Sequence, residues 1–322
     1  MKKRQLIKYF FASLISAAVS GPILTGCGPA AEDDRPSIAA EDDRPTIVVG
    51  GKNFTEQYLL SEMAAALLEE AGYNTRMRTG VSTDIARQSL VNDQIDLYYE
   101  YTGTAYTVFY DQDDPEIMGD SEKVYEWVKG KDAEKDIVWL GRVDFNNAYT
   151  LIMRQSHSEE LGIETIADLA EYVRETPDEL TFGIGLEFYE RPDGFKKLLA
   201  TYDFQPPDNK VSTMSDGLTY RALRDEQVDV AMGFDTDGRI AAFGFITLKD
   251  TQDFFPAYNP APVIRKPVLE QHPEIREVLA PLAKHLNTDI MRQLNAEVDV
   301  EHRDSKEVAV EWLKNQGLIE MN

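Results

Sequence analysis

From residue 46 onward, short β-rich runs alternate with segments of helical periodicity, and this alternation constrains the fold more than any other feature of the sequence. Alternation of this kind is typical of α/β proteins, in which helices cover a sheet. A chain of 322 residues is long enough for two such domains. Strands are expected at TIVVGGK, RMRTG, IDLYYEY, IVWLGRV, YTLIMR, LTFGIGL, VDVAMGF, FITL and PVIR.

The first helix is expected over residues 56–71, with Thr55 as its candidate N-cap and Gly72 at its end. No apolar run after residue 46 is long enough to span a bilayer. Further helices are expected at TDIARQSLVND, SEKVYEWVKG, TIADLAEYVRE, PDGFKKLLATY, GLTYRALRDE, residues 267–286, NTDIMRQLNAEV and SKEVAVEWLKNQG.

The first 26 residues have the layout of a secretory signal peptide: a basic start, an apolar stretch and a small-residue end. The sequence LTGC at its end resembles a bacterial lipobox, which implies that Cys27 becomes the lipidated first residue of the mature chain. A transmembrane anchor is the alternative, although the apolar stretch is short and interrupted. Cys27 is the only cysteine, so no intramolecular disulfide is possible.

Residues 27–45 contain the unit AEDDRP twice and are acidic and poor in apolar residues, which predicts a solvated tether. The formal net charge of the whole chain is −24. Without the four basic residues of the leader, 29 basic residues stand against 57 acidic ones, a net charge of −28. Nucleic-acid binding is therefore disfavoured, because it requires a basic surface.

The sequence contains no recognisable catalytic motif. The four histidines, His157, His272, His285 and His302, are scattered without metal-ligand spacing. There is no nucleophile elbow and no P-loop, and GIGLEF lacks the third glycine of a dinucleotide-binding loop. We therefore expect a binding protein without a metal or cofactor. An exported enzyme or a structural lipoprotein is the alternative from another class.

Six polar-aromatic segments follow or precede expected strands, where α/β folds place their ligand sites. Each one alone has a local explanation: EYTGT as a strand ending in a turn at Gly103, FPAY as an ordinary loop, and RPDG as a turn before a helix. The six segments are GGKNFTEQ, EYTGTAY, DFNNAY, EFYERPDG, MGFDTDGR and FFPAYNPAP.

Together, K-x-F-x-E-Q-Y, Y-x-E-Y-T-G-T, E-F-x-x-R-x-D-G and F-F-P-x-Y resemble the substrate-binding proteins of ABC importers for glycine betaine, choline, carnitine and related solutes. The resemblance runs from residue 46 to the C-terminus. It implies an extracytoplasmic, lipid-anchored monomer that performs no chemistry and delivers its ligand to a permease driven by an ATPase. Glycine betaine is the first expected ligand, with proline betaine, choline and carnitine as relatives.

The fold that this resemblance implies is the α/β type II periplasmic binding protein fold, a two-domain clamp with the ligand cleft between the domains. Domain I is expected to comprise residues 46–145 and 245–322, and domain II residues 146–244. The chain is expected to cross between them near residues 144–146 and again between Asp235 and Phe245.

By the same resemblance, an aromatic box would be formed by Tyr101, Tyr149, Phe234 and Tyr258. A trimethylammonium group cannot donate a hydrogen bond, so proteins recognise it with ring faces, each contributing ~0.5–2 kcal/mol. The neighbouring Tyr98, Tyr99 and Tyr106 are expected to serve packing or the rim.

Lys52, Arg191 and the hydroxyl of Thr104 match the positions that would hold a betaine carboxylate, and the two cations would create a local positive field. The alternatives are that Lys52 is merely solvated and that Arg191 pairs with Glu187 or Asp193. A choline-specific site should not need two cations, so choline remains the alternative ligand. Two departures leave the preferred solute open: Phe234 replaces a frequent tyrosine, and GVSTD at residues 80–84 replaces a glycine-rich loop.

Overall fold

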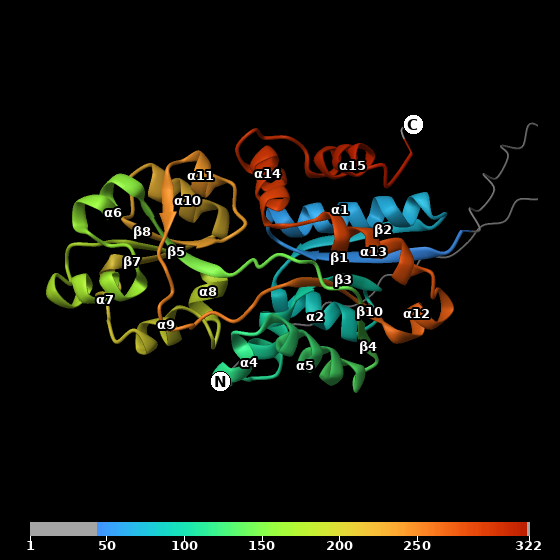
Figure 1. Cartoon of the computed structure of the whole chain (residues 1–322), viewed down its shortest axis with the longest axis horizontal. Helices are drawn as coiled ribbons and strands as arrows, with labels where there is room; N and C mark the ends of the chain where they lie inside the picture. The colour runs from blue at the N-terminus through green and yellow to red at the C-terminus, as the bar shows by residue number, and fades with distance from the viewer. Residues whose placement is uncertain (1–43, 321–322) are drawn as a thin grey trace, which may run out of the picture. The chain divides into compact units, whose positions relative to one another are not determined.

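Two five-stranded sheets organise the chain, and each is the centre of one lobe (Figure 1). The computed structural model describes residues 44–320. The predicted signal peptide, the lipidation site Cys27 and nearly all of the tether lie outside the described residues. None of the described helices combines the length and the apolar character needed to cross a bilayer.

The first sheet has the strand order β2-β1-β3-β10-β4, and the second has the order β7-β6-β8-β5-β9. In both sheets four strands run in the same direction, and the remaining strand, β10 or β5, runs antiparallel to its two neighbours. The strands are β1 (Thr46–Lys52), β2 (Asn74–Val81), β3 (Leu97–Tyr101), β4 (Ile137–Trp139), β5 (Tyr149–Arg154), β6 (Phe182–Gly185), β7 (Val211–Met214), β8 (Val230–Phe234), β9 (Phe245–Thr247) and β10 (Pro260–Arg265).

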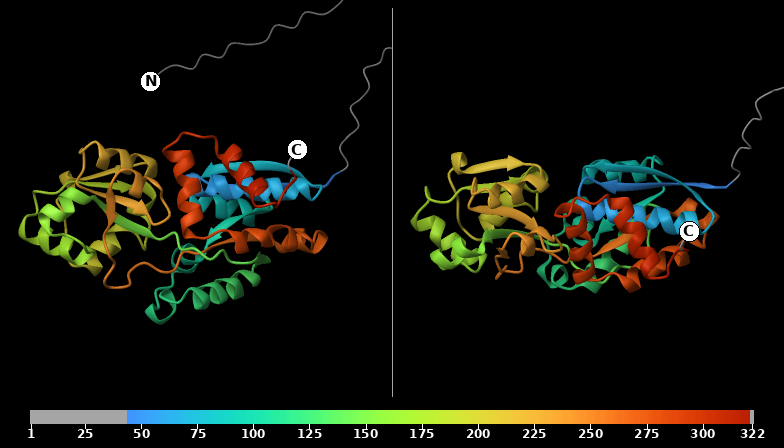
Figure 2. Two further views of the ribbon diagram at one scale, coloured as in Figure 1. Left: turned by 45° about the horizontal axis from the view of Figure 1, so that its top comes forward. Right: turned by 90° about the horizontal axis from the view of Figure 1, so that it is seen from above.

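The helices of the first lobe come from both ends of the described chain (Figure 2). They are α1 (Thr55–Glu70), α2 (Thr83–Val91), α3 (Thr102–Thr104), the π-helix η1 (Ala105–Phe109), α4 (Pro115–Met118), α5 (Ser121–Ala133), α12 (Lys266–Gln271), α13 (Ile275–His285), α14 (Thr288–Asp299) and α15 (Ser305–Asn315).

The helices of the second lobe come from the middle of the chain. They are α6 (Gln155–Leu161), α7 (Ile166–Glu175), α8 (Leu186–Glu190), α9 (Phe195–Thr201), the 3₁₀ helix η2 (Asp208–Lys210), α10 (Asp216–Arg224) and α11 (Arg239–Ala242).

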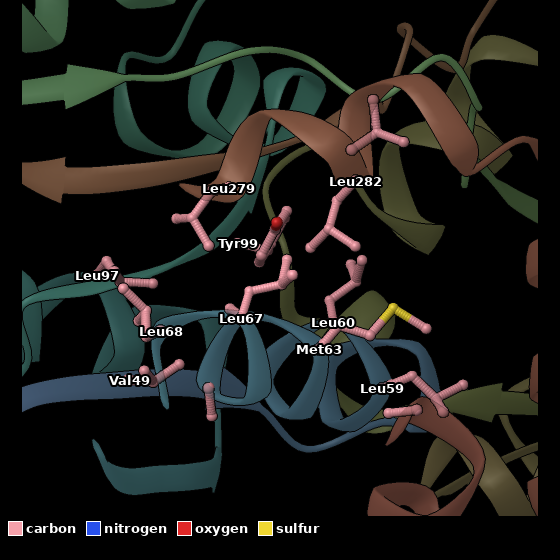
Figure 3. Packing of buried hydrophobic residues seen from close by; sticks show 14 of the residues in the cluster. Val49, Leu59, Leu60, Met63, Leu67, Leu68, Leu97, Tyr99, Leu279 and Leu282 are labelled. Carbon is pink, nitrogen blue, oxygen red and sulfur yellow. The ribbon is translucent and has the colours of Figure 1, made fainter. Parts of the chain in front are cut away.

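Helix α1 lies at the centre of the first core, between the sheet and helices α13 to α15. Leu60, Met63 and Leu67 of α1 are buried together with Tyr99 of β3 and Leu282 of α13 (Figure 3). Each fully buried side chain of this size contributes about 1.5–3 kcal/mol. Tyr98, Tyr99 and Tyr106 are all fully buried, as packing residues should be.

The chain passes between the lobes twice, from β4 to β5 through residues 140–148 and from β9 to β10 through residues 248–259. The second passage lies later than expected, because β9, which begins at Phe245, pairs with β5 in the second sheet. The two passages bond to each other: the Asn147 N–H donates to the Tyr258 carbonyl at 3.0 Å, and the Tyr258 N–H donates to Asn146 Oδ1 at 2.7 Å. The division into domains with the expected boundaries stays a prediction.

Several local expectations are corrected by the structure. The single helix expected over residues 267–286 is two helices, because the residue before Pro273 is driven out of the helical region. Thr55 is the first residue of α1 rather than its cap, and its hydroxyl donates to Asp299 at 2.7 Å. Gly103 lies inside a short helix rather than a turn, and β7 is a strand that the sequence patterns do not predict.

Candidate ligand-binding site

All seven residues expected at the ligand site line one cavity. Sheet topology explains why they meet. Lys52, Tyr101 and Phe234 stand at the carboxyl ends of parallel strands, where α/β sheets place ligands. The strands β5 and β10 run antiparallel and therefore begin at the same edges, with Tyr149 opposite Phe234 and Tyr258 just before β10. Arg191 and Thr104 complete the set.

The four predicted rings belong to a continuous aromatic cluster, and Phe54 is the fifth ring that lines the cavity. Ring centroids are 6.0 Å apart between Tyr101 and Phe54, 5.5 Å between Phe54 and Phe234, 4.8 Å between Phe234 and Tyr149, and 5.9 Å between Tyr149 and Tyr258. Phe54 and Phe234 stack with their planes only 12° apart. The cluster thus joins the first lobe to the second through ring contacts.

Phe54 is not among the site residues expected from the sequence, although it stands in the segment GGKNFTEQ. Three more lining residues belong to the polar-aromatic segments: Asn53 to GGKNFTEQ, Asn147 to DFNNAY and Glu187 to EFYERPDG. Thr83 comes from the GVSTD loop, whose role the sequence leaves open, and Asp216 belongs to none of these segments. The available signal for Asn53, Phe54, Asn147 and Glu187 was therefore that each lies in a polar-aromatic segment at a strand end.

Lys52 is only 2% exposed, so the alternative of a solvated side chain is wrong. Its Nζ lies 2.5 Å from Glu100 Oε1 and 5.1 Å from the centroid of the Tyr101 ring. The same carboxylate accepts a hydrogen bond from the Tyr98 hydroxyl at 2.8 Å. The positive charge of Lys52 therefore already has a buried partner within the protein.

Arg191 forms the ion pair that the sequence offered as an alternative to ligand contact. Its Nε and Nη2 donate to the two oxygens of Asp193 at 2.8 and 2.7 Å, and its Nη1 lies 3.8 Å from Glu187 Oε1. Its Cζ lies 5.1 Å from the centroid of the Tyr149 ring. Both cations of the cavity are thus accompanied by carboxylates, which cancel much of the positive field expected from them. Their contact with a ligand stays a prediction.

Thr104 and Asp216 offer polar groups to the cavity that other described residues do not take up. No hydrogen bond within residues 44–320 involves the Thr104 hydroxyl, which leaves it free for a ligand. The Asp216 carboxylate likewise has no hydrogen bond or ion pair in this part of the chain. Burial, followed by the nearby charge of Glu187, raises the pKa of Asp216 to about 6.

Glu56 lies behind the rings as a fully buried carboxyl group of α1. It accepts hydrogen bonds from the hydroxyl of Tyr101 at 2.6 Å, from Asn147 Nδ2 at 2.9 Å and from the hydroxyl of Thr236 at 2.6 Å. Burial raises the pKa of Glu56 to about 7, although these donors oppose the shift. Sequence reasoning missed Glu56, which carries no signal beyond its place in the segment GGKNFTEQ.

The lining has the chemistry of a recognition site: ring faces for a cation, paired charges and a free hydroxyl. No cluster of three or more metal-ligating side chains occurs between residues 44 and 320. The structure has two lobes, each built on a sheet with one antiparallel strand, and a cavity lined by residues of both lobes. This arrangement defines the class of periplasmic solute-binding proteins.

Comparison with known proteins agrees with this class and narrows it. Residues 45–315 match the family described as the substrate-binding domain of the ABC-type glycine betaine transport system. The chain therefore belongs to this family, which binds substrates for transport and is not a family of enzymes. Substrate-binding proteins of ABC importers work outside the cytoplasm.

The glycine-betaine-binding protein of Pseudomonas aeruginosa is 35% identical over 277 residues, which cover 84% of this chain and 88% of that protein. The glycine betaine-binding protein YehZ of Escherichia coli is 33% identical, with 84% and 90% covered. The structure of apo YehZ matches with a TM-score of 0.63 and 32% identity, and the matched region covers 85% of this chain and 99% of the YehZ chain. A structure described as a glycine betaine/carnitine/choline ABC transporter has a TM-score of 0.69 and 27% identity, with 85% and 100% covered.

Proposed function

We propose that this protein captures a quaternary ammonium solute, glycine betaine first among them, in the aromatic cavity and delivers it to the permease of an ABC importer. The observation that carries the proposal is the continuous cluster of five rings, which includes all four predicted from the sequence. A methylated cation would contact ring faces from both lobes, so binding favours the closed arrangement over an open one.

Calorimetric titration with glycine betaine, proline betaine, choline and carnitine tests this function, with glycine as the unmethylated control. Tyr149→Leu keeps an apolar side chain but removes a ring face, and we expect it to weaken binding about 2- to 30-fold. Tyr172→Leu, on helix α7 outside the cavity, should leave the affinity unchanged. The absence of binding heat with every quaternary amine would refute the proposal.

A specific observation favours choline as the second candidate ligand. Lys52 and Arg191 are each paired with a carboxylate, and Glu187 and Asp216 add further negative charge to the lining. A net cation suits such a lining better than a zwitterion does. Arg191→Ala separates the candidates: loss of glycine betaine affinity with little effect on choline would assign Arg191 to a ligand carboxylate, and unchanged betaine affinity would remove it from that role.

We further propose that the mature chain is a monomer held at the membrane by a lipid on Cys27. The lipobox-like LTGC and the acidic tether of residues 27–45 support this proposal. Labelling with an alkyne fatty acid in a bacterial host, followed by membrane fractionation, should mark the wild type and not Cys27→Ala. Light scattering of the chain without its leader measures the oligomeric state, and a dimer would contradict the second part.

A further inference from the structure

Two buried carboxylates, Glu56 and Asp193, flank the aromatic cluster, and each holds one of its tyrosines by the hydroxyl. Glu56 accepts from Tyr101 at 2.6 Å, and Asp193 Oδ2 accepts from Tyr258 at 3.3 Å. Glu56 is 1% exposed and Asp193 is 8% exposed. Neither residue lines the cavity that the rings enclose.

Each carboxylate also takes a donor from the opposite lobe. Glu56 belongs to α1 of the first lobe, and the hydroxyl of Thr236, which follows β8 in the second lobe, donates to it at 2.6 Å. Asp193 follows α8 in the second lobe, and the hydroxyl of Thr107, in η1 of the first lobe, donates to it at 2.5 Å. The two arrangements are reciprocal, with one carboxylate contributed by each lobe.

We infer that Glu56 and Asp193 are positioning residues, each of which holds the hydroxyl of one cluster tyrosine together with a threonine hydroxyl from the opposite lobe. A buried carboxylate that loses its donors carries a large desolvation penalty, so each carboxylate favours the arrangement in which the opposite lobe supplies its hydroxyl. Closure of the cleft then completes the hydrogen bonding of the two carboxylates that hold the Tyr101 and Tyr258 rings. The inference rests on the proposed function in taking these rings as ligand contacts.

The two carboxylates differ in how they respond to pH. Burial raises the pKa of Glu56 to about 7. Burial opposes the charge of Asp193 too, but the guanidinium of Arg191 and the hydroxyl of Thr107 lower the pKa of Asp193 below its ordinary value. Only Glu56 of this pair therefore changes its charge near neutral pH.

The charged groups around Glu56 set the background of any pH profile. Asp237 and Asp299 share a second cavity with Glu56, and both pair with Arg239, which lines the same cavity. Asp216, from α10, lines it as well and has a pKa of about 6. Beyond Tyr101, the cation of Lys52 is held by Glu100. Measuring every variant in an Asp216→Asn background separates the titration of Asp216 from that of Glu56.

The sign of the pH effect follows from the charges. A cation bound at the Tyr101 ring stabilises the ionised form of Glu56 more than the protonated form. Ligand binding therefore lowers the pKa of Glu56, and by linkage the affinity for a cation rises as pH increases through about 7. We expect a rise of about fivefold between pH 6 and pH 8.

The test uses Thr→Val substitutions, which keep the shape of the side chain and remove only the donor from the opposite lobe. Thr236→Val and Thr107→Val should each weaken choline binding about tenfold, measured by calorimetry with choline chloride. Thr236→Val should also move the midpoint of the pH profile upward, because a donor that lowers the pKa of Glu56 is lost. Thr107→Val should leave the midpoint where it is.

Thr150→Val is the matched control, because its buried hydroxyl donates to the adjacent Leu151 carbonyl in β5 and to no other group within residues 44–320. Glu56→Gln should give a flat profile across neutral pH. Wild-type affinity in both Thr→Val variants, or an unchanged midpoint in Thr236→Val or Glu56→Gln, would overturn the inference. A wild type that binds no quaternary amine at all would instead refute the proposed function, so the two failures are distinguishable.

Discussion

At the scale of single residues, the charge of the cavity is set by carboxylates more than by cations. The sequence analysis expected Lys52 and Arg191 to face a ligand carboxylate and named pairing with Glu187 or Asp193 as the alternative for Arg191. The structure gives each cation an acidic partner. Asp216 is the carboxylate of the lining that has no such partner among residues 44–320. Counted together with the acidic partners of its two cations, the cavity lining that the ligand contacts therefore has a net negative charge.

Asp216→Asn should shift selectivity from choline toward glycine betaine. Removing a negative charge near the cavity weakens the attraction for a net cation and relieves the repulsion of a carboxylate, and we expect the affinity ratio to change about threefold. Calorimetry above pH 7, where Asp216 is ionised, measures the ratio. Asp208→Asn, an exposed site in η2, serves as control. An unchanged ratio would show that Asp216 does not sense the ligand.

The buried carboxyl of Glu56 should make stability fall with rising pH. Because its folded pKa is raised from 4.5 to about 7, the folded state binds the extra proton between these values. Its ionisation therefore lowers the free energy of unfolding progressively from pH 4.5 to pH 7, by on the order of 3 kcal/mol in total. Urea unfolding at several pH values should show this loss in the wild type and not in Glu56→Gln. An equal dependence of stability on pH in the wild type and in Glu56→Gln would contradict the assignment of this effect to Glu56.

At the scale of elements, the local patterns predicted most strands and helices, and the errors have identifiable causes. The break between α12 and α13 follows from Pro273, whose effect on the preceding residue is a local rule that could have been applied. The helical turn after β3 was missed because EYTGT has no helical periodicity. Its conformation depends on Tyr258, which arrives from far along the chain.

Gly103 is required at that turn by close packing rather than by its backbone angle. A Cβ atom at this position would lie 2.7 Å from Tyr258 Cδ1 and 3.0 Å from the Ala257 carbonyl oxygen. Gly103→Ala should therefore displace the Tyr258 ring, lower stability by about 1–3 kcal/mol and weaken ligand binding. Thermal unfolding and calorimetry measure the two effects.

Gly130→Ala is the matched control for Gly103→Ala. Gly130 is exposed on α5, and a Cβ atom there meets nothing within 4 Å. Alanine should raise the free energy of unfolding by about 0.5–1 kcal/mol and leave binding unchanged. A destabilised Gly130→Ala, or a Gly103→Ala that binds like the wild type, would contradict the packing explanation.

At the scale of the whole molecule, the contacts that join the lobes include the two passages, the ring cluster, the two carboxylates and a close backbone approach. The approach is at Gly238 in the second lobe, where a Cβ atom would lie 2.5 Å from Ala296 Cβ and 2.7 Å from the Arg292 carbonyl oxygen in α14. The segment from Thr236 to Gly238 is held there because Asn295 Nδ2 donates to the Thr236 carbonyl at 2.9 Å.

Gly238→Ala should push this segment away from α14 and separate the lobes at this side. Because Thr236 lies in the same segment, Glu56 should lose its donor, and ligand affinity should fall by about tenfold. Small-angle scattering with and without ligand measures the separation. Gly217→Ala, whose Cβ would meet no atom closer than 3.5 Å, is the control. Equal scattering for Gly238→Ala and wild type would exclude the effect.

The sequence by itself determined the fold class and seven of the thirteen residues that line the cavity. Alternating periodicity is a local property, and segments at strand ends converge wherever strands pair, so motifs along the chain suffice to identify Tyr101, Tyr149, Phe234 and Tyr258. Only the tertiary structure decided how charges pair and where the second passage runs. The donors to Glu56 come from residues 45, 91 and 180 positions away, and no local pattern encodes contacts of that range.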